Sequence, residues 1–188
     1  MFYKYISSSS LELIKYISII TMIIDHVALV LMDENEILRA IGRFAFIGFS
    51  FVLVYNYRYH TRDKDLYKKR LIIFASLSQL PYYLAFDYLA LNILFLFFFS
   101  LIAIDNIKKM IKEDNTKKIF LSTLLLGTAF IASFLTSYNF FGFLFIIVLY
   151  FSLDNKIFIP GIILLIILVN LKLYNAIFSL LSLYTIYY

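Results

Sequence analysis

Residues 11–32 read LELIKYISIITMIIDHVALVLM, and this stretch indicates the class of fold. A hydrocarbon core about 30 Å thick takes roughly 20 helical residues to cross, and this segment is apolar over most of such a length. In lipid the backbone must satisfy its own hydrogen bonds, and the segment lacks the alternating pattern of a barrel strand. A transmembrane helix is therefore predicted here.

Further apolar segments follow along the chain, separated by charged clusters. With the first, they are Leu11–Met32, Ile37–Tyr57, Leu71–Phe86, Tyr88–Ile104, Ile119–Ser137, Asn139–Leu153, Ile157–Leu171 and Leu173–Tyr188. Of the 188 residues 63% are hydrophobic and 15% are charged, against about 25% charged in a soluble domain. The sequence predicts a single all-α membrane domain over residues 1–188, a polytopic transmembrane helix bundle of about eight spans. Some segments are short, so seven or nine crossings stay open.

The N-terminal region shows no cleavage site of a signal peptide, so the first helix is expected to remain. The serine run Ser7–Ser10 and Glu12 suggest a capping box with Ser9 as N-cap, which starts the helix near Leu11.

The chain has no cysteine and two histidines, which excludes disulfides and disfavours a zinc site, so no metal is predicted. The five glycines form no motif and are expected to permit close helix packing.

Two connections are strongly basic, and they indicate the orientation. The one after the second span holds Arg58, Arg62, Lys64, Lys68, Lys69 and Arg70, and the one after the fourth holds Lys108, Lys109, Lys112, Lys117 and Lys118. The positive-inside rule assigns both to the cytoplasm. The connections after the first and third spans carry Asp33, Glu34, Glu36 and Asp87 against Arg39, which suits the outer side. An even number of crossings then places the N-terminus in the cytoplasm.

The basic connections could instead bind lipid headgroups or nucleic acid. Topology accounts for them without a further function, so the bilayer is the expected partner and nucleic acid is not.

Polar groups inside spans are rare because burying each one without a partner is costly, so they are candidates for function. The candidates are Asp25, His26, Arg43, Gln79 and Asn92. The helical rise and the inferred topology together predict that all five lie in one layer in the outer half of the membrane. A structural interpretation stays open, in which Asp25 pairs with Arg43 and the amides cross-link the helices.

His26 follows Asp25 directly, and neighbouring helical residues point about 100° apart, so each should face a different partner. An imidazole suits the role of general base near neutral pH, although a histidine satisfied within a bundle is the alternative. His60 lies between Arg58 and Arg62 just beyond the second span. These three could bind the phosphates of a cytosolic cofactor, or His60 could simply be a solvated interfacial residue.

Five elements in the first half of the chain resemble a known family. They are Leu11 to His26 ending in Ile24-Asp25-His26, then Gly42-Arg43-Phe44-Ala45-Phe46, His60-Thr61-Arg62, Phe74 to Tyr82, and Asn92-Ile93-Leu94-Phe95. In order and spacing they are similar to the TraX family, named for the conjugal-transfer protein that N-acetylates F-type pilin. Two positions depart from the family pattern, Ile47 where a proline is common and Leu96 where a threonine is common.

The resemblance implies a multispanning acyltransferase of the bacterial cytoplasmic membrane that uses acetyl-CoA. The acceptor could be the amine of a pilin or exported peptide, or a hydroxyl of a glycan or envelope polymer. His26 would be the general base, Asn92, Gln79 or Arg43 would stabilise the oxyanion, and Arg58, His60 and Arg62 would lie near the donor phosphates. A small proton-coupled transporter using Asp25, Arg43 and His26, or a non-enzymatic assembly factor of a secretion or conjugation system, are the rival functions.

Overall fold

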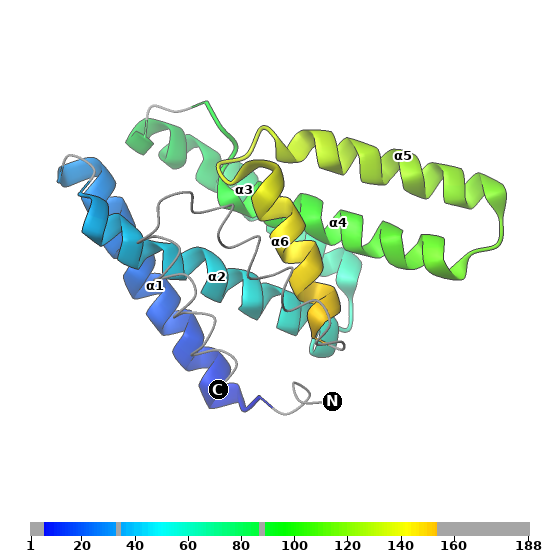
Figure 1. The fold of residues 1–188 in the computed structure, drawn as a ribbon, viewed down its shortest axis with the longest axis horizontal. Helices are drawn as coiled ribbons and strands as arrows, with labels where there is room; N and C mark the ends of the chain where they lie inside the picture. Colours follow the sequence, from blue (N-terminus) through cyan, green and yellow to red (C-terminus); the bar gives the residue numbers. More distant parts are fainter. Residues whose placement is uncertain (1–5, 33–34, 87–88, 154–188) are drawn as a thin grey trace. The chain divides into compact units, whose positions relative to one another are not determined.

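The computed structural model describes residues 6–32, 35–86 and 89–153, and these form an all-α structure. The helices are α1 (Ser8–Leu31), α2 (Glu36–Tyr59), α3 (Lys64–Phe86), α4 (Ile93–Lys112), α5 (Thr116–Ser133) and α6 (Asn139–Ser152) (Figure 1). Each of the first six predicted apolar segments overlaps one helix. The last two predicted spans, 157–171 and 173–188, lie outside the described residues.

Helix ends differ from the ends of the apolar segments. Helix α3 begins at Lys64 rather than at Leu71, because the Asp63 carboxylate accepts a hydrogen bond of 2.8 Å from the Leu66 N–H and caps the helix. Helix α4 continues to Lys112, beyond the predicted Ile104. Hydrophobicity marks the apolar part of a helix, whereas capping groups decide where the helix ends.

The N-cap of α1 is Ser7, so the prediction of Ser9 was wrong. The Ser7 hydroxyl accepts a hydrogen bond of 3.1 Å from the Ser10 N–H, three positions later. A run of serines offers several equivalent caps, and the earliest one extends the helix by the largest number of residues. Glu12 consequently lies outside the capping box.

Helices α1 and α2 are long and apolar enough to cross a membrane, with mean hydropathy 1.8 and 1.9 over their most apolar windows. Within the described part of the chain they alone meet that standard, and α6 is a shorter apolar helix. The count of eight spans therefore stays a prediction.

Large apolar side chains are exposed on several helices. Leu31 on α1, Leu84 on α3 and Phe120 on α5 are 75%, 73% and 70% exposed. Soluble monomers rarely present extended apolar surfaces of this kind, whereas a lipid-facing surface requires them. The pattern fits helices whose outer faces contact hydrocarbon.

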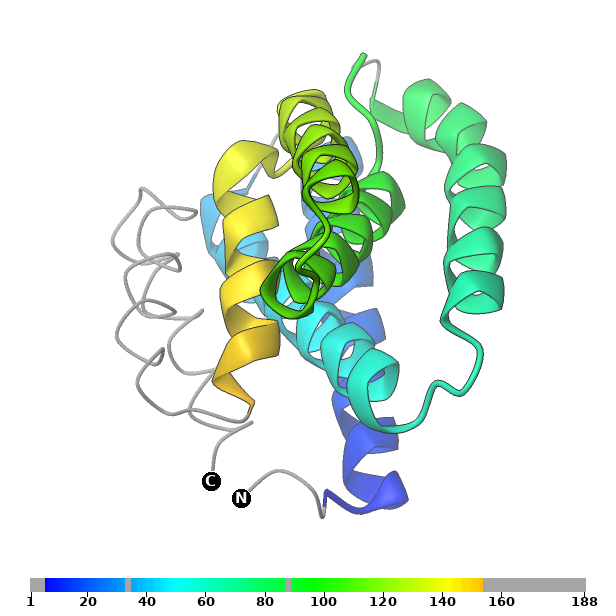
Figure 2. The same cartoon turned by 90° about the vertical axis from the view of Figure 1, so that its right-hand side faces the viewer.

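The chain divides into two compact units, the first with α1 and α2 up to His60, the second over Thr61–Tyr150. In the first unit α2 runs back along α1. In the second, α4 packs against both α3 and α5, and Figure 2 also shows α4 beside α5. A single membrane domain over the whole chain stays a prediction.

Close packing in the first unit depends on two glycines of α2. A Cβ atom on Gly48 would collide with the Ser18 hydroxyl, and one on Gly42 would collide with the Asp25 side chain. Both glycines therefore permit the helices to approach closely, as predicted. Gly127 on α5 differs, because a Cβ atom there would meet nothing within 4 Å.

The second unit is held partly by short backbone contacts and aromatic rings. The Leu91 N–H donates to the Leu135 carbonyl at 2.8 Å, which joins the segment before α4 to the end of α5. Phe134, the C-cap of α5, stacks on Phe140 of α6 with ring centroids 5.9 Å apart. Stacked pairs of this kind add about 0.5–1.5 kcal/mol beyond area burial.

Candidate functional site

Asp25 lies on the face of α1 that packs against α2. A Cβ atom placed on Gly42 would stand 2.7 Å from Asp25 Oδ1, so the carboxylate occupies space that a side chain at position 42 would otherwise fill. The side chain of Asp25 is 19% exposed. The missing side chain of Gly42 is thus the local reason that a charged group fits between two apolar helices.

Asp25 forms an ion pair with Arg39, whereas the sequence had left open a pair with Arg43. Arg39 Nε lies 3.9 Å from Asp25 Oδ1, and this oxygen has no hydrogen-bond partner in the described part of the chain. Arg39 and Arg43 are four residues apart and therefore share a face of α2, which sequence alone could not resolve. That spacing was the signal that could have identified Arg39, which had been assigned to the outer connection.

His26 follows Asp25 on α1 and is exposed. Its Nδ1 lies 2.8 Å from the Met22 carbonyl oxygen, one turn earlier on α1. A carbonyl can only accept, so Nδ1 donates its proton, and in the neutral ring Nε2 carries the lone pair. This contact favours the tautomer of the neutral ring that carries its proton on Nδ1.

Gln79 and Asn92 lie together in the second unit. The Asn92 N–H donates to Gln79 Oε1 at 2.9 Å, and Gln79 Nε2 donates to the Ala90 carbonyl at 3.0 Å. Asn92 is 4% exposed and is the N-cap of α4, accepting at Oδ1 from the Leu94 N–H at 3.0 Å. The two amides thereby anchor the segment that leads into α4 onto α3.

The amide protons of Asn92 are fully used. Its Nδ2 donates to the Ala75 carbonyl at 2.9 Å and to Ser78 Oγ at 3.1 Å, and an amide nitrogen carries two protons. Gln79 Nε2 uses one proton on Ala90 and keeps a second. Gln79 could therefore donate a hydrogen bond to an external oxyanion without breaking an existing one, whereas Asn92 could not.

The three predicted phosphate-binding residues lie around the end of α2 and the start of the next segment. Arg58 places its guanidinium carbon 5.7 Å from the Tyr59 ring centroid, and the His60 ring lies 5.4 Å from that of Tyr55. His60 is also the C-cap of α2, its N–H donating to the Asn56 carbonyl at 2.9 Å. Arg62 is exposed and is the second residue of the second unit.

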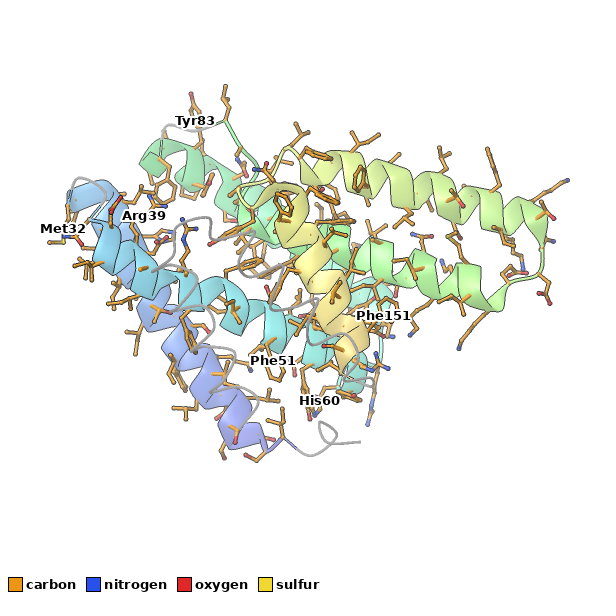
Figure 3. All side chains as sticks on the ribbon, viewed as in Figure 1. Met32, Arg39, Phe51, His60, Tyr83 and Phe151 are labelled. Carbon is orange, nitrogen blue, oxygen red and sulfur yellow. The ribbon has the colours of Figure 1, made fainter. Side chains whose placement is uncertain are left out.

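Arg39 and His60 lie at opposite ends of α2, as Figure 3 shows. From Gly42 to Arg58 the helix rises roughly 24 Å at 1.5 Å per residue, close to the thickness of a hydrocarbon core. The first unit therefore holds Asp25 and Arg39 near one end of the α1–α2 hairpin, and Arg58 and His60 at the other end.

The structure places the predicted residues in two sets. Asp25, His26, Arg43, Arg58 and His60 belong to the first unit. Gln79, Asn92 and Arg62 belong to the second. The single layer of five residues therefore stays a prediction. Among the described residues no group of three or more His, Asp or Glu side chains could hold a metal ion.

Comparisons with known proteins give one match. A family model described as TraX protein matches residues 10–186, nearly the whole chain. No curated protein and no solved structure matches the chain significantly.

Proposed function

This chain belongs to the TraX family, and from that premise we propose that it is a membrane-embedded acetyltransferase using acetyl-CoA as donor. The acceptor is an amine, such as the N-terminus of a pilin or exported peptide, or a hydroxyl of an envelope polymer. The observation that carries this proposal is the 2.8 Å contact between His26 Nδ1 and the Met22 carbonyl oxygen, since an Nδ1 that donates leaves Nε2 as the nitrogen that can take a proton from an acceptor. The long apolar helices α1 and α2 support the membrane location.

In the proposed reaction His26 Nε2 takes a proton from the acceptor nitrogen or oxygen. The acceptor attacks the thioester carbonyl carbon, and the carbonyl oxygen becomes an oxyanion in the tetrahedral intermediate. The carbon–sulfur bond then breaks, and the CoA thiolate leaves and takes up the proton held by His26. The products are the acetylated acceptor and free CoA.

Charge that develops on the oxyanion needs a positive partner. We assign this role to Arg43, which lies one turn along α2 from Arg39, the residue that pairs with Asp25. Asp25 and Arg39 position the start of α2 against α1. Gln79 and Asn92 enter the proposal as positioning residues, because their hydrogen bonds organise the start of α4.

The donor phosphates would lie near Arg58, His60 and Arg62. The pantetheine arm, comparable to about five extended chain units, spans roughly 17 Å, which is less than the roughly 24 Å rise from Gly42 to Arg58. Side chains on a helix lean towards its N-terminus. Because α1 and α2 are antiparallel, Arg58 and His26 therefore lean towards each other, which reduces the gap that the arm must span.

The test uses the purified full-length protein in detergent with acetyl-CoA and candidate acceptor peptides. Release of the CoA thiol and acetylation of the peptide are measured together. His26→Ala should lower transfer by about 10²–10⁴-fold, as loss of a general base does. Val30→Ala, one turn further along α1 and also exposed, is the matched control and should keep wild-type activity.

A folded His26→Ala variant with full activity would remove His26 from the mechanism. A wild-type protein that is folded but releases no CoA and acetylates no acceptor would favour a transporter or an assembly factor.

A further inference from the structure

The first turns of α3 and the last turns of α4 line an open hollow of about 430 Å³. Five lysines line it, two from α3 and three from α4, and we call it the lysine basin. They are Lys64, Lys68, Lys108, Lys109 and Lys112. The two basic connections, far apart in sequence, thus meet at one end of the α3–α4 pair.

Three carboxylates also line the basin, but each is already close to a lysine. Lys68 Nζ lies 3.0 Å from Asp65 Oδ1 and 2.7 Å from Asp105 Oδ2. Glu113 is 3.1 Å from Lys118, which is not part of the basin. Five lysines against three carboxylates leave a formal charge of +2, and one carboxylate is further neutralised from outside.

Two basin lysines are available to an external anion. Lys109 and Lys112 are exposed, lie three residues apart on one face of α4, and form no salt bridge with a described residue. Beside them Lys108 donates to the Tyr150 hydroxyl at 3.2 Å. The pKa of the Asp65 carboxyl is lowered by its hydrogen bond to Lys68, by the charge of Lys68 and, less, by that of Lys109, which indicates a positive potential here.

Helix stability does not explain all of these lysines. Lys109 and Lys112 occupy the last turn of α4, where the helix dipole favours cations. Lys64 and Lys68 occupy the first turns of α3, where the dipole disfavours them. The positive-inside rule accounts for lysines in cytoplasmic connections, but not for their convergence on one hollow.

We propose that the lysine basin binds a phosphate-bearing ligand. Its volume falls within the roughly 300–1,000 Å³ of small-molecule sites, and lysine ammonium groups bind phosphate as point charges. One source of the phosphate is the adenosine phosphate end of acetyl-CoA, and this assignment rests on the proposed function. Arg62, one of the residues assigned to the donor phosphates, precedes Lys64 by two residues, so their Cα atoms lie within about 7.6 Å. The other source is the headgroup of an anionic phospholipid.

The experiment uses the full-length protein in nanodiscs and two probes. Adenosine 3′,5′-bisphosphate binding is measured by calorimetry in neutral phosphatidylcholine discs, and bound phosphatidylglycerol is measured by native mass spectrometry. The test variant is Lys109→Gln with Lys112→Gln, and the matched control is Lys69→Gln with Lys117→Gln, two exposed lysines outside the basin. A Lys109→Arg, Lys112→Arg variant retains the charge and checks that the site is folded.

We expect the glutamine variant to bind one probe about tenfold or more weakly, since it loses two charge-assisted contacts. The control should change by less than about twofold, and the arginine variant should bind. Loss of bisphosphate binding would identify the ligand of the basin as the adenosine phosphate end of the acyl donor. Loss of phosphatidylglycerol binding alone would identify the ligand as a lipid headgroup. Unchanged binding of both probes overturns the proposal.

Acetyl transfer by the same preparations separates this inference from the proposed function. If wild-type protein transfers acetyl groups and the basin variant binds both probes normally, only the basin assignment fails. If wild-type protein transfers nothing and the basin variant loses a probe, the proposed function fails and the phosphate site stands.

Discussion

The ammonium of Lys68 lies 2.7 Å from the carboxylate of Asp105 and so joins the start of α3 to the second half of α4. The two side chains are 18% and 17% exposed, so solvent screens the pair less than it screens a surface pair. Burial on its own would lower the pKa of Lys68. The hydrogen bonds and charges of Asp105 and Asp65 outweigh burial and raise the pKa.

Replacing Asp105 should therefore destabilise the second unit in a pH-dependent way. A lysine with a raised pKa in the folded protein contributes stability below its ordinary value of 10.5 and loses that contribution as pH rises through the folded value. Asp105→Asn should melt at a lower temperature than wild type at pH 7, and the difference should narrow above pH 10.5. Asp114→Asn, at an exposed site, is the control. A difference that does not depend on pH would contradict the ion-pair explanation.

Gly42 and Gly127 should respond oppositely to alanine. Gly42→Ala forces a methyl group into the Asp25 side chain and should cost about 1–3 kcal/mol, as overpacking does. Gly127→Ala enters open space and should be neutral or stabilise its helix by about 0.5–1 kcal/mol. Thermal melting in detergent compares them. Equal melting temperatures would show that α1 and α2 approach less closely than described.

Asp25 should couple energetically to Arg39 rather than to Arg43. A double-mutant cycle of Asp25→Asn with Arg39→Gln should give a coupling within about 0.5–3 kcal/mol, while the matched cycle with Arg43→Gln should give nearly none. Stability in detergent is the measurement. A larger coupling in the Arg43 cycle would restore the Asp25–Arg43 pair that the sequence left open.

Asn92 and Asn115 are both N-caps, but only Asn92 carries a buried network. Asn115→Ala should cost about 1 kcal/mol, the usual value of a lost cap. Asn92→Ala should cost about 1–3 kcal/mol more, because the Ala75 carbonyl and the Ser78 hydroxyl lose the amide donor of Asn92 at a buried site. Melting of the two variants decides this. Equal losses would mean that the contacts with α3 contribute nothing.

The orientation can be tested because the chain has no cysteine. Single cysteines at Lys64 and Lys112 should label only from the cytoplasm with a membrane-impermeant maleimide, and one at Glu36 only from outside. Lys64 and Lys112 line one basin, so they must label from the same side. Opposite labelling of these two positions would contradict the packing of α3 and α4.

Much of the fold could be predicted from local patterns. Apolar segments bounded by charged clusters predicted six helices that the structure describes, because hydrophobic length and charge are properties of consecutive residues. The ends were less accurate at Ser7 and Lys64, where capping hydrogen bonds decided them. The 100° between neighbouring residues correctly separated Asp25 from His26, since that angle is intrinsic to a helix.

The sequence by itself determined the family, the helical class and the small residues that let α1 and α2 approach, since each follows from residue type and local spacing. Only the tertiary structure decided that Asp25 lies beside Arg39 and that both protons of the Asn92 amide are used. It also decided that five lysines from two distant connections line one hollow. Two residues one turn apart on a helix, such as Arg39 and Arg43, lie on the same face, so the sequence pattern does not distinguish them. The packing of one helix on another decides which of the two contacts Asp25. Contacts between residues such as Lys68 and Asp105 depend on that packing, which no local pattern encodes.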